Sequence, residues 1–172
     1  GFKHSMILLV SENKKHLNVL ETYGYEKRGI GAKVEFGVGV IGIVAEKKKL
    51  MRMANLGMQR SYMQAIREQV QITNKNKLQD KVELPGLKNA ESQVAIPMLI
   101  DNELVGVFSV ESEKMNIFDK SDEILIGILA NQTASALENA RLYQLEQKRL
   151  KELNKAHHCL LYTSDAADEY SR

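Results

Sequence analysis

The sequence predicts antiparallel hairpins combined with helices, followed by one long C-terminal helix. Short apolar runs flank turn residues at positions 11–15 and again at Asp101-Asn102, which is the pattern of β-hairpins. Residues 58–70 have apolar side chains at helical spacing, and this indicates an amphipathic helix. Residues 122–157 contain no proline and predict a helix of roughly 50 Å at 1.5 Å per residue.

Composition and length favour one soluble domain. The chain has 172 residues, of which 44% are hydrophobic and 27% charged, enough for one core but not for two full domains. No apolar run approaches the roughly 18–20 residues that span a bilayer. The formal net charge of +2 comes from scattered lysines, so nucleic acid is not expected as a partner. The single cysteine, Cys159, fits a reducing compartment, and we expect the protein to be cytoplasmic.

The N-terminal third predicts a hairpin, a short helix and a strand. Residues 5–10 form a short apolar run typical of a buried strand, and residues 17–23 predict its antiparallel partner. Residues 40–46 predict a short helix, and residues 50–53 another strand. Because the first strand starts almost at once, we expect a fragment that lacks its natural neighbours at both ends.

The middle of the chain combines a long polar connection with the clearest hairpin. Residues 71–91 form the connection, which follows the helix of residues 58–70. Residues 92–100 and 103–111 predict a hairpin with a two-residue loop. Pro97 cannot donate to a strand ladder, so its strand should lie at an edge or contain a bulge there. On the second strand, Ser109 and Glu111 share one face.

The C-terminal helix has a charged start and two apolar sections. Residues 119–123 are rich in Asp and Glu, which favours capping of the helix N-terminus over a catalytic carboxylate pair. Six residues are expected to pack on the sheet: Ile124, Leu125, Ile128, Leu129, Ala136 and Leu137. Leu142, Leu145, Leu150 and Leu153 follow at spacings of 3, 5 and 3, a pattern suited to a partner helix. The later half therefore predicts a coiled-coil dimer or a connecting helix.

Residues 159–172 differ from what precedes them, because the stretch CLLYTSDAADE does not continue the charged helical pattern. It resembles a translated sequencing adapter, so we expect a non-native tail there. The expected organisation is a domain at residues 1–143, a signalling helix at 144–158 and this tail.

The stretch EFGVGVIG (residues 35–42) has the G-x-G-x-x-G spacing of a dinucleotide-binding loop. The context of that motif is absent, because no buried parallel strand precedes Gly37 and no acidic residue lies about 20 residues beyond the glycines. We therefore interpret Gly37, Gly39 and Gly42 as residues that turn the backbone and let the following helix approach the sheet.

Three stretches together resemble a GAF domain, over residues 6–143. FGVGVIGIVAEKKKLMRMANL is similar to the family's glycine turn, short helix and strand. LPGLKNAESQVAIPMLIDNELVGVFSVES resembles its paired strands, and FDKSDEILIGILANQTASALENARLY its closing helix. The resemblance implies an α+β, PAS-related fold: an antiparallel sheet flanked by helices, with the long C-terminal helix extending as a coiled coil. The family's usual N-terminal helix is missing.

The residues also favour some branches of the family over others. Phe118, Asp122 and Glu123 match half of the cyclic-nucleotide-binding motif, but its Asn-Lys half is not at the strand end. Bilin attachment and methionine-sulfoxide reduction both need a cysteine, and residues 1–158 contain none. The histidines, His4, His16 and His157-His158, are interpreted as surface residues, so no metal or cofactor is predicted. No catalytic constellation is visible.

The function predicted from this resemblance is a small-molecule sensor in a cytoplasmic signalling protein, regulatory and not itself an enzyme. The parent protein would have a kinase, cyclase or phosphatase output domain, reached through a homodimer of the terminal helices. Six positions are expected to bind the ligand, under a cover formed by residues 58–91: Met53, Asn55, Tyr62, Ser92, Ala95 and Ser109. The alternatives are a structural dimerisation module without a ligand and, less favoured, a cyclic-nucleotide-binding domain.

Overall fold

The computed structural model describes residues 2–26, 29–57, 86–87 and 89–169. The chain divides into two compact units, Gly1–Ala134 and Ser135–Arg172, which are described separately below. The helix expected at residues 58–70, most of the polar connection after it and the candidate residue Tyr62 lie outside the described residues.

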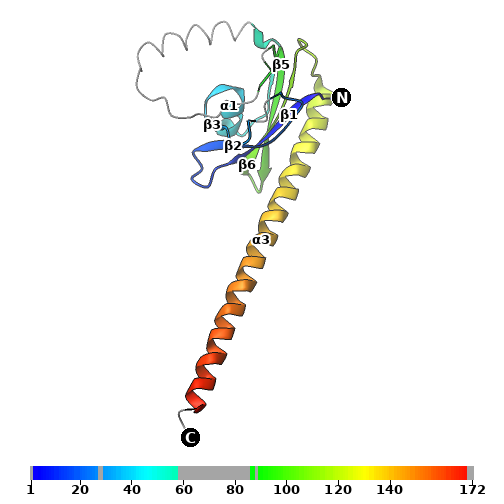
Figure 1. The fold of residues 1–172 in the computed structure, drawn as a ribbon. Coiled ribbons are helices and arrows are strands. Elements are labelled where there is room, and N and C mark those ends of the chain that lie inside the picture. The colour runs from blue at the N-terminus through cyan, green and yellow to red at the C-terminus, as the bar shows by residue number, and fades with distance from the viewer. Residues whose placement is uncertain (1, 27–28, 58–85, 88, 170–172) are drawn as a thin grey trace, which may run out of the picture. The chain divides into compact units, whose positions relative to one another are not determined.

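Six strands of the first unit form one antiparallel sheet in the order β3-β2-β1-β6-β5-β4 (Figure 1). They are β1 (His4–Val10), β2 (His16–Tyr23), β3 (Lys33–Glu35), β4 (Met51–Met53), β5 (Ser92–Ile100) and β6 (Glu103–Ser112). The predicted hairpins are confirmed as β1–β2 and β5–β6, and the two are joined by antiparallel pairing of β1 with β6. The short edge strand β3 was not predicted, because its three residues are too few to show a period.

The turn between β5 and β6 has the geometry that a two-residue hairpin requires. Asp101 and Asn102 have φ angles of 48° and 67°, the left-handed conformation that matches the twist of the strands. Of the two alternatives predicted for Pro97, an edge strand does not hold for β5 as a whole, because β4 pairs with it. However, β4 reaches only as far as Ala95, so Pro97 pairs with β6 alone. The register shifts between Met98 and Leu99, close to the position where a bulge was predicted.

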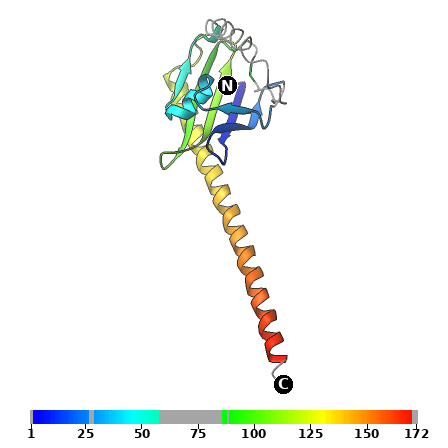
Figure 2. The same cartoon turned by 90° about the vertical axis from the view of Figure 1, so that its left-hand side faces the viewer.

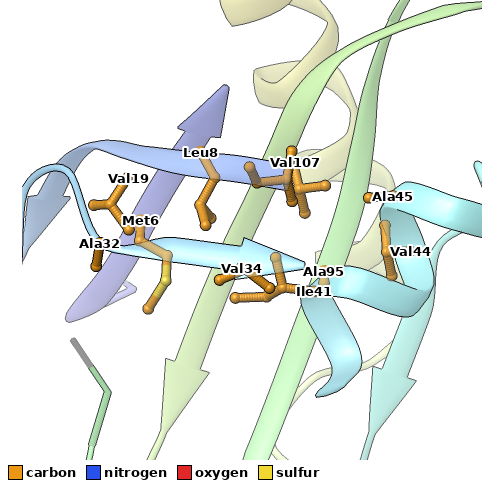
Figure 3. Packing of buried hydrophobic residues seen from close by; sticks show 11 residues of the cluster. Met6, Leu8, Val19, Ala32, Val34, Ile41, Val44, Ala45, Ala95 and Val107 are labelled. Carbon is orange, nitrogen blue, oxygen red and sulfur yellow. The ribbon is translucent and has the colours of Figure 1, made fainter. Parts of the chain in front are cut away.

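Helix α1 (Gly39–Lys47) lies against one face of the sheet, over β5 and β6 (Figures 1 and 2). Figure 3 shows the apolar side chains that meet between them. The cluster draws Met6, Leu8, Leu17, Val19, Ala32 and Val34 from the first half of the sheet, Ile41, Val44 and Ala45 from α1, and Ala95 and Val107 from β5 and β6. We call this the α1 face of the sheet.

The glycine cluster before α1 performs the backbone role expected from the sequence. Gly37 and Gly39 have φ angles of 79° and 65°, a region that residues with a Cβ rarely adopt. Gly42 sits inside α1, where a Cβ would lie 2.3 Å from the carbonyl oxygen of Glu35. The motif therefore makes a tight turn and lets α1 approach the strand before it.

Helix α3 (Lys120–Glu169) begins with a reciprocal cap in the first unit. The Asp122 backbone N–H donates to Asp119 Oδ1 at 2.9 Å, and the Asp119 N–H donates to Asp122 Oδ2 at 3.0 Å. This satisfies two backbone donors that the helix itself leaves unpaired. The predicted capping role of the acidic start is confirmed.

The prediction of which face of α3 packs on the sheet was wrong. Ile126, Ala130 and Ala134 are fully buried, and Gly127 lies next to Ile96 of β5. Ile124, Leu125, Ile128 and Leu129 are instead 42–58% exposed, and Ala136 is exposed as well. Apart from Ile126, the residues facing the sheet are small, which lets the helix approach closely and leaves the other large apolar side chains on the outer face.

The second unit consists of the remainder of α3, which continues as a helix to Glu169. The change of pattern at Cys159 does not end the helix, because residues 159–169 contain neither glycine nor proline. Leu142, Leu145, Leu150 and Leu153 are exposed, between 41 and 66%. Within the described residues, no helix is long and apolar enough to cross a membrane.

Candidate functional site

Three of the predicted ligand residues share the α1 face of the sheet. Met53 of β4 pairs with Gln93 of β5, and Ala95, two residues further along β5, pairs with Ser109 of β6. Since paired residues of neighbouring strands point to the same side, Met53, Ala95 and Ser109 lie on one face. Asn55 is half-buried and follows β4 by two residues.

Ser92 does not share this face. It lies three residues before Ala95, and an odd separation places it on the opposite side of the strand. Its hydroxyl is buried and donates to the Lys114 carbonyl oxygen at 2.7 Å. Ser92 thus anchors the loop after β6, and the structure does not bring it together with the other predicted residues.

Polar groups gather at one end of the α1 face, where the apolar cluster stops. Gln93 Nε2 donates to Ser109 Oγ at 2.9 Å, and both residues are buried. Glu111 is opposite Gln93 in the register and is only 9% exposed. Its Oε2 accepts a hydrogen bond from the backbone N–H of Leu87 at 3.0 Å. A buried amide, hydroxyl and carboxylate therefore lie side by side.

Tyr25 completes this group from the connection after β2. Its ring lies 5.6 Å from that of His4, which is paired with Glu111 across β1 and β6. Among the described residues, the buried Tyr25 hydroxyl has no hydrogen-bond partner. Burial raises the pKa of this hydroxyl well above its ordinary value, and the nearby Glu111 carboxylate raises it further through its charge and a side-chain contact. The hydroxyl therefore stays protonated, with the Glu111 carboxylate as the acceptor beside it.

The polar end of the α1 face is defined here as Tyr25, Met53, Gln93, Ser109 and Glu111. Sequence reasoning found Met53 and Ser109 but missed the other three. Strand alternation could have identified Gln93 and Glu111, because Glu111 shares the parity of Ser109 and Gln93 that of Ala95. No sequence signal identified Tyr25, which lies in an irregular connection.

The residues that match half of the cyclic-nucleotide motif have structural roles. Phe118 is buried, and Asp122 forms the helix cap. Glu123 is buried and forms an ion pair with Arg52 of β4, with 3.2 Å between Oε1 and Nε. In the described part of the chain, no group of His, Cys, Asp and Glu side chains could hold a metal ion.

Comparison with solved structures shows which class of fold this sheet and helix arrangement belongs to. The GAF domain of a phosphoenolpyruvate-protein phosphotransferase (ptsP) from Coxiella burnetii has a TM-score of 0.62 at 17% identity, over 84% of this chain and 76% of that one. The free methionine-R-sulfoxide reductase from Neisseria meningitidis, solved in complex with its substrate, has a TM-score of 0.60 at 18% identity, over 83% and 71%. Residues 122 to 287 of a methyl-accepting chemotaxis protein give 0.60 at 17%, over 83% and 82%.

The sequence itself matches the GAF domain family over residues 1–138. The chain therefore belongs to the GAF family, whose members are signalling and sensory modules. A search of curated protein sequences gave no match. The resemblance to GAF domains found in the sequence is therefore confirmed. GAF domains are typically regulatory, although some of the structural neighbours are enzymes.

Proposed function

We propose that this chain is a small-molecule-sensing regulatory domain of a cytoplasmic signal-transduction protein, and that the polar end of the α1 face binds the ligand. The supporting observation is the burial of the Tyr25 hydroxyl beside the Glu111 carboxylate, which is opposite the buried Gln93 in the sheet. Buried polar groups are stable only when they are hydrogen-bonded, and ligand sites combine apolar walls with a few convergent polar groups. A polar ligand that accepts a hydrogen bond from Tyr25 fits this arrangement.

Met53 and Ala95 supply apolar surface next to these polar groups. Asn55 remains a candidate contact, and so does Tyr62, which lies outside the described residues. The domain acts by binding and not by turnover, and it passes the ligand state through α3 to a kinase, cyclase or phosphatase outside this sequence. The physical requirement is that the ligand binds one arrangement of α3 better than another.

The test is isothermal calorimetry of the whole chain against a panel of metabolites and cyclic nucleotides. Two buried serines make a matched pair of variants. Ser109→Ala removes the hydroxyl that accepts from Gln93, whereas Ser92→Ala removes a hydroxyl on the opposite face. Loss of one hydrogen bond should weaken binding up to about tenfold in Ser109→Ala and leave it unchanged in Ser92→Ala.

A folded protein that binds no member of the panel would count against a ligand site. Equal weakening by both serine variants would place the ligand elsewhere. Binding of a cyclic nucleotide alone would favour the cyclic-nucleotide branch of the family.

A second candidate function is dimerisation, and the outer face of α3 favours it. Ile124, Leu125, Ile128 and Leu129 form an exposed apolar stripe of the kind that marks an interaction surface. We propose that two copies of the chain pair along α3 through this stripe, and that Leu142, Leu145, Leu150 and Leu153 continue the pairing. Without a ligand, the domain would then serve as a structural module.

Sedimentation equilibrium tests this pairing. Ile128→Glu should shift the chain from dimer to monomer, because it places a charge in the apolar contact. Val38→Glu is the matched control, since Val38 is 51% exposed and Ile128 52%; it should leave the dimer intact. A wild-type monomer at all concentrations would refute the proposal for this chain.

A further inference from the structure

Strand β4 lies between the proposed ligand site and the start of α3. Met51 and Met53 pair with Ala95 and Gln93, so their side chains belong to the α1 face. Arg52, between them, pairs with Val94 and belongs by alternation to the opposite face, where α3 packs. One strand of three residues thus presents side chains to both places.

Arg52 joins β4 to the first turn of α3 by two contacts. Its Nη1 donates to the carbonyl oxygen of Phe118 at 2.8 Å, and its Nε lies 3.2 Å from Glu123 Oε1. The Glu123 side chain is 9% exposed and that of Arg52 39%, so the ion pair is shielded from water on the helix side. Lys120 Nζ holds the second oxygen of Glu123 at 2.7 Å.

The backbone after β4 makes a second connection. The Asn116 N–H donates to the Ala54 carbonyl oxygen at 2.9 Å, which attaches the loop before α3 to the residue after Met53. The Leu56 N–H donates to the Glu91 carbonyl oxygen at 2.8 Å, close to where β5 begins. A displacement of Met53 therefore changes the position of groups bonded to the segment that starts α3.

β4 is also weakly held within the sheet. Among the described residues, it pairs along only three positions, and β5 is its one neighbour in the sheet order. An edge strand with so few backbone hydrogen bonds shifts more readily than β1 or β6, each of which has a strand on both sides.

We propose that Arg52 is a positioning residue that couples occupancy of the polar end of the α1 face to the first turn of α3. A ligand that displaces Met53 or Gln93 moves β4, and the Arg52 guanidinium transmits this shift to Phe118 and Glu123. The inference deepens the proposed sensing function and rests on it for the ligand. The coupling itself is a property of the ligand-free protein and is testable without a ligand.

The test is hydrogen–deuterium exchange of the whole ligand-free chain, read at the amides of residues 120–126. Gln93→Ala serves as the perturbation, because it removes the contact to Ser109 beside Met53. In the otherwise natural chain, it should raise exchange at residues 120–126 on the order of twofold or more. The double variant Arg52→Met with Glu123→Met removes both partners of the ion pair, so neither charge is left unpaired. In this background, Gln93→Ala should leave exchange at residues 120–126 unchanged.

Two further variants make the result specific. Lys14→Gln breaks the exposed ion pair with Glu103 and should leave the effect of Gln93→Ala intact. Arg52→Lys keeps the charge but cannot reach both Phe118 and Glu123 as the guanidinium does, and it should give a smaller effect. This variant also replaces the double-methionine background if that background does not fold.

An equal effect of Gln93→Ala with and without the Arg52 contacts would overturn the proposal. So would a change at residues 51–53 and 93–95 with none at residues 120–126. Either result would leave the calorimetric test of ligand binding unaffected, so the failure of the coupling is distinguishable from the failure of the sensing function.

Discussion

Gly42→Ala should destabilise the first unit, because α1 has no space for a methyl group at this position. The added Cβ would lie 2.3 Å from the Glu35 carbonyl oxygen and 3.3 Å from the Gly37 nitrogen. Both are backbone atoms, so no side-chain rotation relieves the contact. The Gly37 N–H also donates to the Gly42 carbonyl at 2.9 Å, which holds the turn and the helix together at this point.

The expected magnitude follows from two opposing terms. Overpacking costs up to about 3 kcal/mol when backbone must shift, and here the shift would also move Ile41, Val44 and Ala45 in the core. Alanine gains about 1 kcal/mol over glycine through helix propensity. The difference is a loss of about 2 kcal/mol in the free energy of unfolding.

Native-state hydrogen exchange of the sheet amides is the suitable assay, because the helix of the second unit would dominate a circular dichroism signal. Gly127→Ala in α3 is the matched control, since its Cβ would have only Ile96 Cδ1, at 4.0 Å. This variant should be stabilised by up to about 1 kcal/mol. If Gly42→Ala were as stable as the natural chain, the close approach of α1 would not be the reason for glycine at this position.

Three further substitutions test separate features. Asp119→Ala removes one half of the α3 cap and should cost about 1 kcal/mol, seen as faster exchange in the first turn of the helix. Asn102→Gly relieves a residue at φ 67°, and because Asn tolerates this conformation, the free energy of unfolding should rise by less than about 1 kcal/mol, measured in urea. The pKa of the Tyr25 hydroxyl is raised in the folded state above its ordinary value of 10.0. Its contribution to the free energy of unfolding is therefore present below pH 10.0 and is lost as the pH rises above that value. The natural chain should thus lose up to about 1.4 kcal/mol per pH unit in that range relative to Tyr25→Phe.

Local features of the fold could be predicted because each has a local cause. The Asp101-Asn102 turn follows from the two residue types that tolerate positive φ, and the cap of α3 from carboxylates at its start. The sheet order could not be predicted, because the pairing of β1 with β6 joins residues about a hundred positions apart. Nothing in the local pattern specifies such a contact.

The face of α3 was predicted wrongly for a general reason. Large apolar residues were taken as buried, yet Ala130 and Ala134 face the sheet while Ile128 is exposed. Periodicity identifies a buried face only when the opposite face is polar. Here both faces are apolar, and the choice between them depends on how closely the helix approaches β5.

The candidate site was only partly predictable, for reasons that concern strands β5 and β6. Alternation along β5 and β6 correctly grouped Ala95 with Ser109, but Ser92 was included although three residues separate it from Ala95. Glu111 was placed on the same face as Ser109 but was not counted as a site residue, whereas in the structure it is buried opposite Gln93. A charge at a strand end reveals its burial only when the segment that covers it is known.

The two apolar faces of α3 and its anchored start suggest how sensing and dimerisation would work together. The inner face, with Ile126, Ala130 and Ala134, packs the helix on the sheet, so a shift at Arg52 would move the part of α3 that belongs to the first unit. If two copies pair through Ile128 and its neighbours, such a shift changes the contact between them. The ligand then needs only to favour one of two packings of that contact by a few kcal/mol. Ile128→Glu should therefore abolish pairing and leave the ligand affinity of the polar end of the α1 face close to that of one natural subunit. A complete loss of ligand binding in this variant would instead show that the site is formed only in the dimer.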